Sequence, residues 1–160
     1  MSKYVEYDLK SITNLELLLA ALADLGWDSG KVEVHDNPVA LYGYHGDRRP
    51  ETATVVIRRN NTGVSASNDI GFVKRPDGTY APIISEYDGN AVARGRNRTG
   101  AGSTLAESIQ ASYGKMAGNK AINTITNVTI PAMKAKGLVP RHATVATVKT
   151  GKVTQLVLRY

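Results

Sequence analysis

Three arginines that alternate with small or polar residues are the clearest candidates for chemistry in this chain. Arg94, Arg96 and Arg98 lead into the run Gly100–Thr104, directly before a predicted helix. Backbone N–H groups at a helix start are unsatisfied and carry partial positive charge, and glycine lets an anion approach them closely. Arginine binds phosphate oxygens bidentately. We therefore predict a site for an anion or nucleic acid formed by Arg94, Arg96, Arg98, Gly100, Gly102, Ser103 and Thr104.

Two other interpretations of residues 94–104 stay open. The segment can be a mobile surface loop followed by a capped helix, or a loop that docks another protein. The run TGAGST lacks the lysine and the spacing of the phosphate-binding loop G-x-x-x-x-G-K-[ST]. Nucleotide hydrolysis is therefore not supported.

The other reactive side chains give no catalytic pattern. The three histidines lack metal-ligand spacing, and the chain has no cysteine. His45 and Asp47 are a possible acid/base pair, although two such residues in a glycine loop more often form a local hydrogen bond. Four acidic residues could supply paired carboxylates, but roles in turns and beside strands explain them. They are Asp69, Asp77, Glu86 and Asp88. The sequence therefore favours a non-enzymatic protein with no catalytic residues, no metal and no cofactor.

Basic doublets stand beside several predicted strands. Arg58-Arg59 and Lys74-Arg75 end predicted strands, and Arg48-Arg49 lies in a predicted loop. Paired basic residues at strand ends are typical of edges that are solvated to deter edge-to-edge pairing. With nearby tyrosines they form an alternative stacking surface for single-stranded nucleic acid. Those tyrosines are Tyr42, Tyr44 and Tyr80.

Charge divides the chain into two unlike parts. The net charge is +6 over 160 residues. Residues 1–88 hold nine Lys/Arg and thirteen Asp/Glu, whereas residues 89–160 hold eleven Lys/Arg and a single acid, Glu107. This asymmetry favours a basic face and an acidic partner, unless the basic residues serve only for solubility or folding interleaves the two parts.

The elements that must position these residues are mainly strands. Leucines at helical spacing predict one helix over residues 15–25, capped by Thr13 or Asn14 and ended by Gly26, with Trp27 packing back against it. Alternation and β-branched residues predict strands. These cover residues 3–9, 31–35, 51–60, 69–75 and 79–88, with residues 36–47 as a loop or an irregular strand. The turn Pro76-Asp77-Gly78 joins the strands over residues 69–75 and 79–88 as a hairpin.

A second helical region and a closing hairpin complete the chain. Thr104 and Glu107 form a capping box, Gly114 and Gly118 predict a kink or break, and Pro131 starts a last turn or kinks the helix. Residues 143–160 predict a hairpin. The expected fold is α+β, a mainly antiparallel sheet built from hairpins with two principal helices on one face. We expect one domain over residues 1–160 with a flexible basic loop at 89–103, which could divide two lobes.

Several short motifs resemble those of one family. They are Leu25-Gly26-Trp27, Gly43-Tyr44 with Gly46, Asn68–Phe72, Asp77-Gly78, Tyr113 and Leu156–Tyr160. Together they resemble the conserved chloroplast reading-frame 35 family, also called domain-of-unknown-function family 1257, which occurs in plastids, cyanobacteria, other bacteria and their viruses. That family has no established activity, so the resemblance assigns no catalytic residues to this chain. The loop at 89–103 departs from the family and looks like an insertion.

We therefore expect a module that binds an anionic partner, first of all nucleic acid, through its basic C-terminal half. The alternative is a structural or assembly subunit, viral or of a multi-protein complex, that uses sheet edges and the 89–103 loop and forms a homo-oligomer or larger assembly. No apolar run is long enough for a membrane span, and the first ten residues lack the apolar region of a signal peptide. The expected location is cytoplasmic, or within the virion if the protein is viral.

Overall fold

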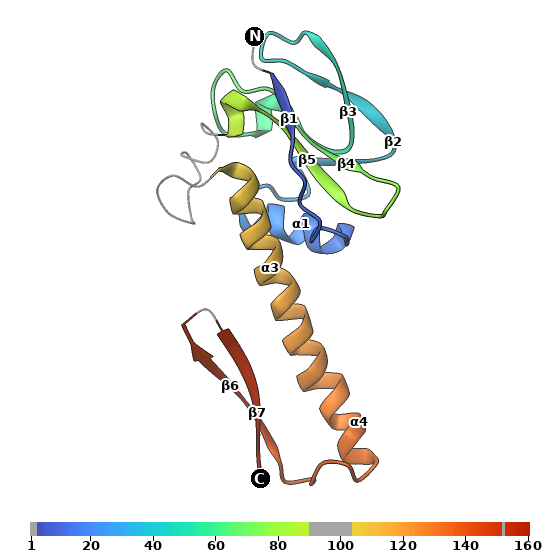
Figure 1. Cartoon of the computed structure of the whole chain (residues 1–160), viewed down its shortest axis with the longest axis vertical. Helices are drawn as coiled ribbons and strands as arrows, with labels where there is room; N and C mark the ends of the chain where they lie inside the picture. Colours follow the sequence, from blue (N-terminus) through green and yellow to red (C-terminus); the bar gives the residue numbers. More distant parts are fainter. Residues whose placement is uncertain (1–2, 90–103, 152) are drawn as a thin grey trace. The chain divides into compact units, whose positions relative to one another are not determined.

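The computed structural model describes residues 3–89, 104–151 and 153–160, and the chain forms two compact units (Figure 1). The N-terminal unit comprises residues 1–116, and the C-terminal unit comprises residues 117–160. The sequence suggested a possible division at the basic loop, but the boundary between the units falls within a helix instead.

The N-terminal unit is built on a five-stranded antiparallel sheet. Its order is β1-β5-β4-β3-β2. The strands are β1 (Tyr4–Glu6), β2 (Val32–Tyr42), β3 (Arg48–Ile57), β4 (Ile70–Lys74) and β5 (Tyr80–Ser85). The C-terminal unit contains a hairpin of β6 (Thr144–Thr150) and β7 (Val153–Arg159). The predicted α+β class with hairpin-built antiparallel sheets is confirmed.

Strand β2 includes most of the segment that the sequence left as a loop or an irregular strand. Its register against β3 shifts between Val34 and Val39, and again between Ala40 and Tyr42. Pro38 lies within the first shift, where its missing N–H removes a donor from the strand pairing. The segment is therefore a bulged edge strand.

Helix α1 (Leu15–Asp24) begins at the predicted residue and ends one residue before the predicted end. The Asn14 side chain accepts a hydrogen bond of 3.0 Å from the backbone N–H of Leu17. Gly26 has a φ of +100°, a conformation that ends helices and favours glycine. The backbone N–H of Trp27 then returns to Leu22 O at 2.8 Å, and the buried indole packs against the core as predicted.

The main core lies between one face of the sheet and two helices, α1 and the first half of α3 (Leu105–Thr124) (Figure 1). Ile57, Ile70 and Phe72 come from the sheet and are fully buried. Tyr113 of α3 also binds the start of α1, because its hydroxyl oxygen accepts the N–H groups of Thr13 at 3.2 Å and Asn14 at 3.1 Å. The two principal helices therefore pack on one face, as predicted.

The opposite face of the sheet holds a smaller cluster packed over Gly71. A Cβ atom at Gly71 would lie 2.7 Å from the Ala53 Cβ and 2.9 Å from the Ile83 Cγ2. Contacts that short are repulsive, so only glycine lets this second layer close on the sheet.

The predicted β4–β5 hairpin forms around Pro76-Asp77-Gly78. Arg75 N donates to Thr79 O at 2.8 Å, and Gly78 has a φ of +85°. Asp77 Oδ1 accepts both the N–H and the hydroxyl of Thr79. The predicted turn at Pro76-Asp77-Gly78 is therefore confirmed, with glycine at the position of positive φ.

The predicted break at Gly114 and Gly118 is wrong, because α3 runs through both residues. Each glycine costs a helix only about 1 kcal/mol. The capping box at Thr104 and the burial of Leu105 and Ile109 offset that cost.

The irregularity lies further on, before Pro131. Residues Ile125–Thr129 form a π-helical segment, in which the N–H of Ile130 donates to Ile125 O, five residues back. Proline lacks an N–H and its ring clashes with the carbonyl four residues earlier, so a widened turn accommodates it. Helix α4 (Ile130–Ala135) follows, and Gly137, with a φ of +72°, ends it as predicted.

Candidate nucleic-acid interface

Of the residues predicted to form an anion site at the start of α3, only the last, Thr104, is among the described residues. Arg94, Arg96, Arg98, Gly100, Gly102 and Ser103 lie outside the described residues. Thr104 N donates to Glu107 Oε2 at 2.9 Å, and Glu107 N donates to Thr104 Oγ1 at 3.3 Å. This confirms the predicted capping box. The Thr104 N–H is therefore already bound to a carboxylate, and an anion at this helix start must use other donors.

Each basic doublet of the N-terminal unit has one arginine paired with a carboxylate. The pairs are Arg49 with Asp47, Arg58 with Glu33 and Asp69, and Arg75 with Glu6 and Asp8. Lys115 of α3 is likewise paired with Asp24 at 2.9 Å. Because these cations are neutralised locally, they add little net attraction for a polyanion.

The stacking surface predicted from three tyrosines is incomplete. Tyr80 is a core residue with only 7% of its surface exposed, whereas Tyr42 and Tyr44 are exposed. The Tyr44 ring lies 3.7 Å from the ring of His45, and the Arg58 guanidinium carbon lies 5.7 Å from the centre of the Tyr42 ring. Two tyrosines, not three, are therefore available for stacking.

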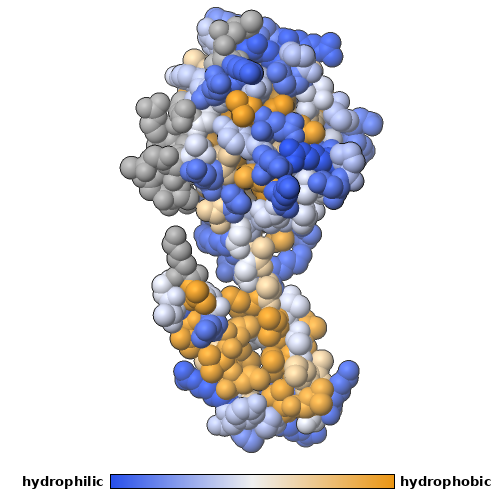
Figure 2. Space-filling model, viewed as in Figure 1, coloured by the Kyte–Doolittle hydropathy of each residue, from blue (hydrophilic) through white to orange (hydrophobic). Residues whose placement is uncertain are grey.

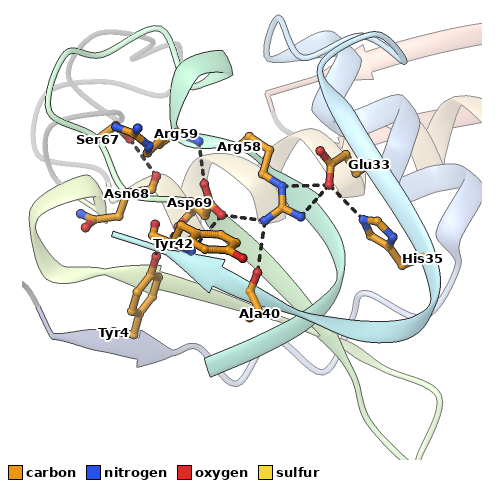
Figure 3. Close-up of polar contacts among 10 residues, drawn as sticks. All are labelled: Tyr4, Glu33, His35, Ala40, Tyr42, Arg58, Arg59, Ser67, Asn68 and Asp69. Atoms are coloured by element: carbon orange, nitrogen blue, oxygen red, sulfur yellow. Dashed lines mark hydrogen bonds and ion pairs between the residues drawn. The ribbon is translucent and has the colours of Figure 1, made fainter. Parts of the chain in front are cut away.

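Asp69 is the centre of a polar network that fixes the ends of three strands (Figure 3). Its buried carboxylate accepts hydrogen bonds from Arg58 Nη1 at 2.8 Å, Tyr42 N at 2.9 Å and Arg59 N at 2.8 Å. Its carbonyl oxygen accepts the Tyr4 hydroxyl at 2.9 Å, and burial of that hydroxyl, with Asp69 nearby, raises the pKa of Tyr4. The network joins β1, β2 and the residues that follow β3 to Asp69, which directly precedes β4.

Glu33 extends this network to the molecular surface. Its Oε2 accepts hydrogen bonds of 2.9 Å from Arg58 Nε and from the His35 Nε2. The hydrogen bond from Arg58 lowers the pKa of Glu33, against the opposite effect of burial. Arg58 thus connects a buried carboxylate to an exposed one.

We expect acid to remove the stabilisation that Glu33 provides. A folded-state pKa below 4.5, the ordinary value for this group, means that the contribution is complete above pH 4.5 and is lost as the pH falls through the folded-state value. Because 41% of the Glu33 side chain is exposed, the loss should be no more than about 1 kcal/mol. Urea unfolding of the Glu33→Gln variant should show a stability difference from the wild type at pH 7 that disappears in acid.

The exposed Asp36 of the same strand offers a control for this measurement. At pH 7 an Asp36→Asn variant should differ less from the wild type than the Glu33→Gln variant does. If the difference between Glu33→Gln and the wild type grows as the pH falls, the assigned pKa direction is wrong.

Asp88 lies in a second buried cluster that the sequence did not reveal. Its side chain is fully buried and accepts hydrogen bonds from the hydroxyls of Ser67 at 2.8 Å and Ser85 at 2.6 Å. The backbone and side-chain N–H groups of Asn68 supply two more, at 3.0 and 2.8 Å. Asp69 and Asp88 do flank strands, but their main role is to hold the turn before β4.

An open pocket of about 350 Å³ lies beside these clusters. Its lining includes one cation, Arg59, with the polar residues Asn60, Ser65 and Ser67, and no carboxylate. Arg59 Nη1 donates to Tyr44 O at 2.7 Å, which fixes the guanidinium at the rim. The pocket therefore suits an anionic group better than a cation. In the described ranges no group of three His, Asp or Glu residues could hold a metal ion.

His45 and Asp47 do not form the acid/base pair considered from the sequence. Asp47 Oδ2 binds Arg49 Nε at 3.0 Å, and its carboxylate packs against Gly43. His45 is exposed and contacts the Tyr44 ring. Because Arg49 binds Asp47, this carboxylate does not orient His45 as it would in a general acid/base pair.

The C-terminal unit is rich in basic residues and lacks acidic ones. Residues 117–160 contain seven Lys/Arg and no Asp or Glu. The cations are Lys120, Lys134, Lys136, Arg141, Lys149, Lys152 and Arg159. One of them, Lys134, donates through Nζ to Ala143 O at 2.5 Å. A unit with no acidic side chain cannot neutralise these cations by itself.

No family model, no curated protein and no solved structure matches this chain. The residues themselves are therefore the only guide to function. Across the parts of the chain that are described, no helix has the length and apolar character needed to cross a membrane.

Proposed function

We propose that this protein is a non-enzymatic module that binds an anionic partner, first of all nucleic acid, through its basic C-terminal half. The observation that carries the proposal is the contrast between the two units. In the N-terminal unit Arg49, Arg58, Arg75 and Lys115 are paired with carboxylates, whereas the C-terminal unit has seven cations and no acid. Phosphate groups are the natural counter-charges for such a unit.

Arg94, Arg96 and Arg98 extend the same basic half toward the start of α3. With Gly100, Gly102, Ser103 and Thr104 they remain our proposed contacts for phosphate. The exposed Tyr42 and Tyr44 would add base stacking if a single strand reaches the N-terminal unit. Such a role would place the protein in the cytoplasm or in a virus particle, and membership of the reading-frame 35 family belongs to the same proposal.

The test is a titration of the intact protein with single-stranded RNA, single-stranded DNA and duplex DNA at 50 and 200 mM salt. Contact with about five phosphates of a single strand predicts a roughly 100-fold loss of affinity over this range. The exposed cations Lys136, Lys149 and Arg159 would be replaced together by glutamine, and Arg94, Arg96 and Arg98 in a second variant. Each triple variant should bind more weakly and show a salt dependence smaller by about two charges.

A third variant controls for net charge. Replacing Lys3, Lys10 and Lys74 by glutamine removes three exposed cations from the N-terminal unit. Its affinity should stay within about threefold of the wild type, because long-range attraction is screened beyond about 8 Å at physiological salt. Equal losses in all three variants, or affinity that does not depend on salt, would refute the proposal.

A further inference from the structure

The C-terminal unit has too small a hydrophobic core to be stable alone. It has 44 residues, and its buried hydrophobic residues are Ile130, Val139 and Ala143. Units near 40 residues usually need disulfides, metals or oligomerisation, and this chain has no cysteine. Large apolar side chains stay exposed instead, among them Val128 at 63% and Val153 at 56%. Figure 2 shows a broad hydrophobic area on this unit.

The β6–β7 hairpin has apolar side chains on both of its faces. Directly paired residues share a face, so the pairs Val145–Leu158 and Thr147–Leu156 lie on one side. The other side carries the pairs Ala146–Val157, Val148–Gln155 and Thr150–Val153. A hairpin with one solvated face would alternate apolar and polar residues. The helical part of the unit can cover one face at most, so the second face needs a cover from elsewhere.

The β7 edge of this hairpin also lacks the features that prevent strand addition. In the five-stranded sheet, edge strand β1 has only three residues, and edge strand β2 carries Asp36, Pro38 and a bulge. By contrast, β7 is uncharged from Thr154 to Leu158 and contains no proline. A two-stranded hairpin is itself marginal in water, and three or more strands are normally required.

We propose that a second copy of this chain covers the C-terminal unit, with β7 of one copy paired antiparallel to β7 of the other about a two-fold axis. The result is a four-stranded sheet. On its second face Val153 of each copy lies opposite Val157 of the other, so these apolar side chains cover one another. The proposal does not depend on nucleic-acid binding.

The charges of the unit permit this pairing. With the two β7 strands centred on Gln155, the two Arg159 residues stand about 27 Å apart at opposite ends. This separation exceeds the screening length of about 8 Å at physiological salt. The positively charged units repel each other weakly, so added salt strengthens the pairing.

The size of the surface indicates which residues must take part. One face of a seven-residue hairpin measures only about 24 by 10 Å. A stable interface buries about 800 Å² from each partner, so the hairpin alone is too small. The exposed Ile125 and Val128 of the helical part supply the additional apolar surface.

Other occupants fit these observations less well. Nucleic acid would neutralise the cations but leave Val128 and Val153 in contact with water or phosphate. A lipid bilayer would bury the valines but leave the N–H and C=O groups of both strand edges unpaired. A second copy supplies apolar contacts and strand pairing together.

Sedimentation velocity of the intact protein at 50 and 500 mM NaCl tests the proposal. We expect a dimer whose dissociation constant falls as salt rises, the opposite of the salt effect expected for nucleic-acid binding. Replacing Val128 and Val153 together by the isosteric threonine should raise the dissociation constant at least about tenfold. The matched Val34→Thr variant changes an exposed valine of the N-terminal unit and should leave the dimer intact.

Cysteine cross-linking tests the strand pairing separately, because the natural chain has no cysteine. A Gln155→Cys variant should form a disulfide-linked dimer on mild oxidation, whereas a Lys149→Cys variant on β6 should not. A monomer at both salt concentrations, a dimer broken by Val34→Thr, or cross-linking at position 149 but not at 155 would each overturn the proposal. Binding to anionic vesicles without dimerisation would overturn it as well.

Discussion

Replacement of Asp69 by alanine should lower the free energy of unfolding by about 3–5 kcal/mol, the range for loss of one partner of a buried ion pair. The Asp69 carboxylate has 1% of its surface exposed. Without it the Arg58 guanidinium loses its buried counter-charge, and the N–H groups of Tyr42 and Arg59 lose their acceptors. An unsatisfied buried donor adds to the cost.

Trp27 provides the measurement. It is the only tryptophan and is fully buried in the N-terminal unit, so its fluorescence during urea unfolding follows that unit. An Asp77→Ala variant is the control, because that carboxylate serves an exposed turn. An Asp69→Asn variant keeps one acceptor oxygen and should fall between alanine and the wild type. A loss below 1 kcal/mol for Asp69→Ala would show that the network does not hold the strands together.

Replacement of Trp27 by alanine should cost about 3–5 kcal/mol, the usual range for removing a buried aromatic side chain. The indole belongs to the main core, which also contains Leu18 and Leu22 of α1. Its Nε1–H donates to Asn61 O at 3.1 Å, so truncation also leaves that carbonyl without its donor. The Trp27→Ala variant therefore loses the contact between the residue that follows α1 and the turn that follows β3.

Circular dichroism replaces fluorescence for this variant, since no other tryptophan is present. A Trp27→Phe variant keeps much of the apolar volume and should lose less. Tyr44→Ala removes an exposed aromatic ring and should leave unfolding nearly unchanged. Equal effects of Trp27→Ala and Tyr44→Ala would contradict the assigned core position.

Local signals in the sequence predicted much of the fold. Asn14 caps α1, Gly78 completes the hairpin turn, and Thr104 with Glu107 forms the capping box. Each of these interactions joins residues close together in the chain, so residue type and spacing suffice to predict it. The same is true of the closing hairpin of β6 and β7, whose turn includes Gly151.

Interactions between distant residues could not be predicted in this way. Ser67 and Asn68 meet Asp88 only after β4 and β5 have paired, and Arg58 meets Glu33 across 25 positions. A carboxylate before a strand looks the same whether it faces water or a buried donor. The prediction that Gly114 and Gly118 break the helix failed for the opposite reason. Burial and capping elsewhere in α3 outweigh the low helix propensity of these two glycines.

The segment Asn68–Phe72, which contributes to the family resemblance, has a structural role at every position. Asn68 and Asp69 bind the two buried clusters, Ile70 and Phe72 enter the core, and Gly71 admits the second layer. A motif of this kind specifies a fold and carries no chemistry of its own. The resemblance therefore gives no information about the ligand.

The absence of carboxylates from residues 117–160 has a consequence for calorimetry. Lysine and arginine ordinarily keep their protons below about pH 9.5, and phosphodiesters are ionised throughout this range. Apart from one histidine, His142, the ionisable side chains of this part of the chain are lysine, arginine and one tyrosine, Tyr160. Binding of a nucleic acid there would release small ions and almost no protons, so the heat of binding at pH 8 should be the same in buffers of different ionisation enthalpy.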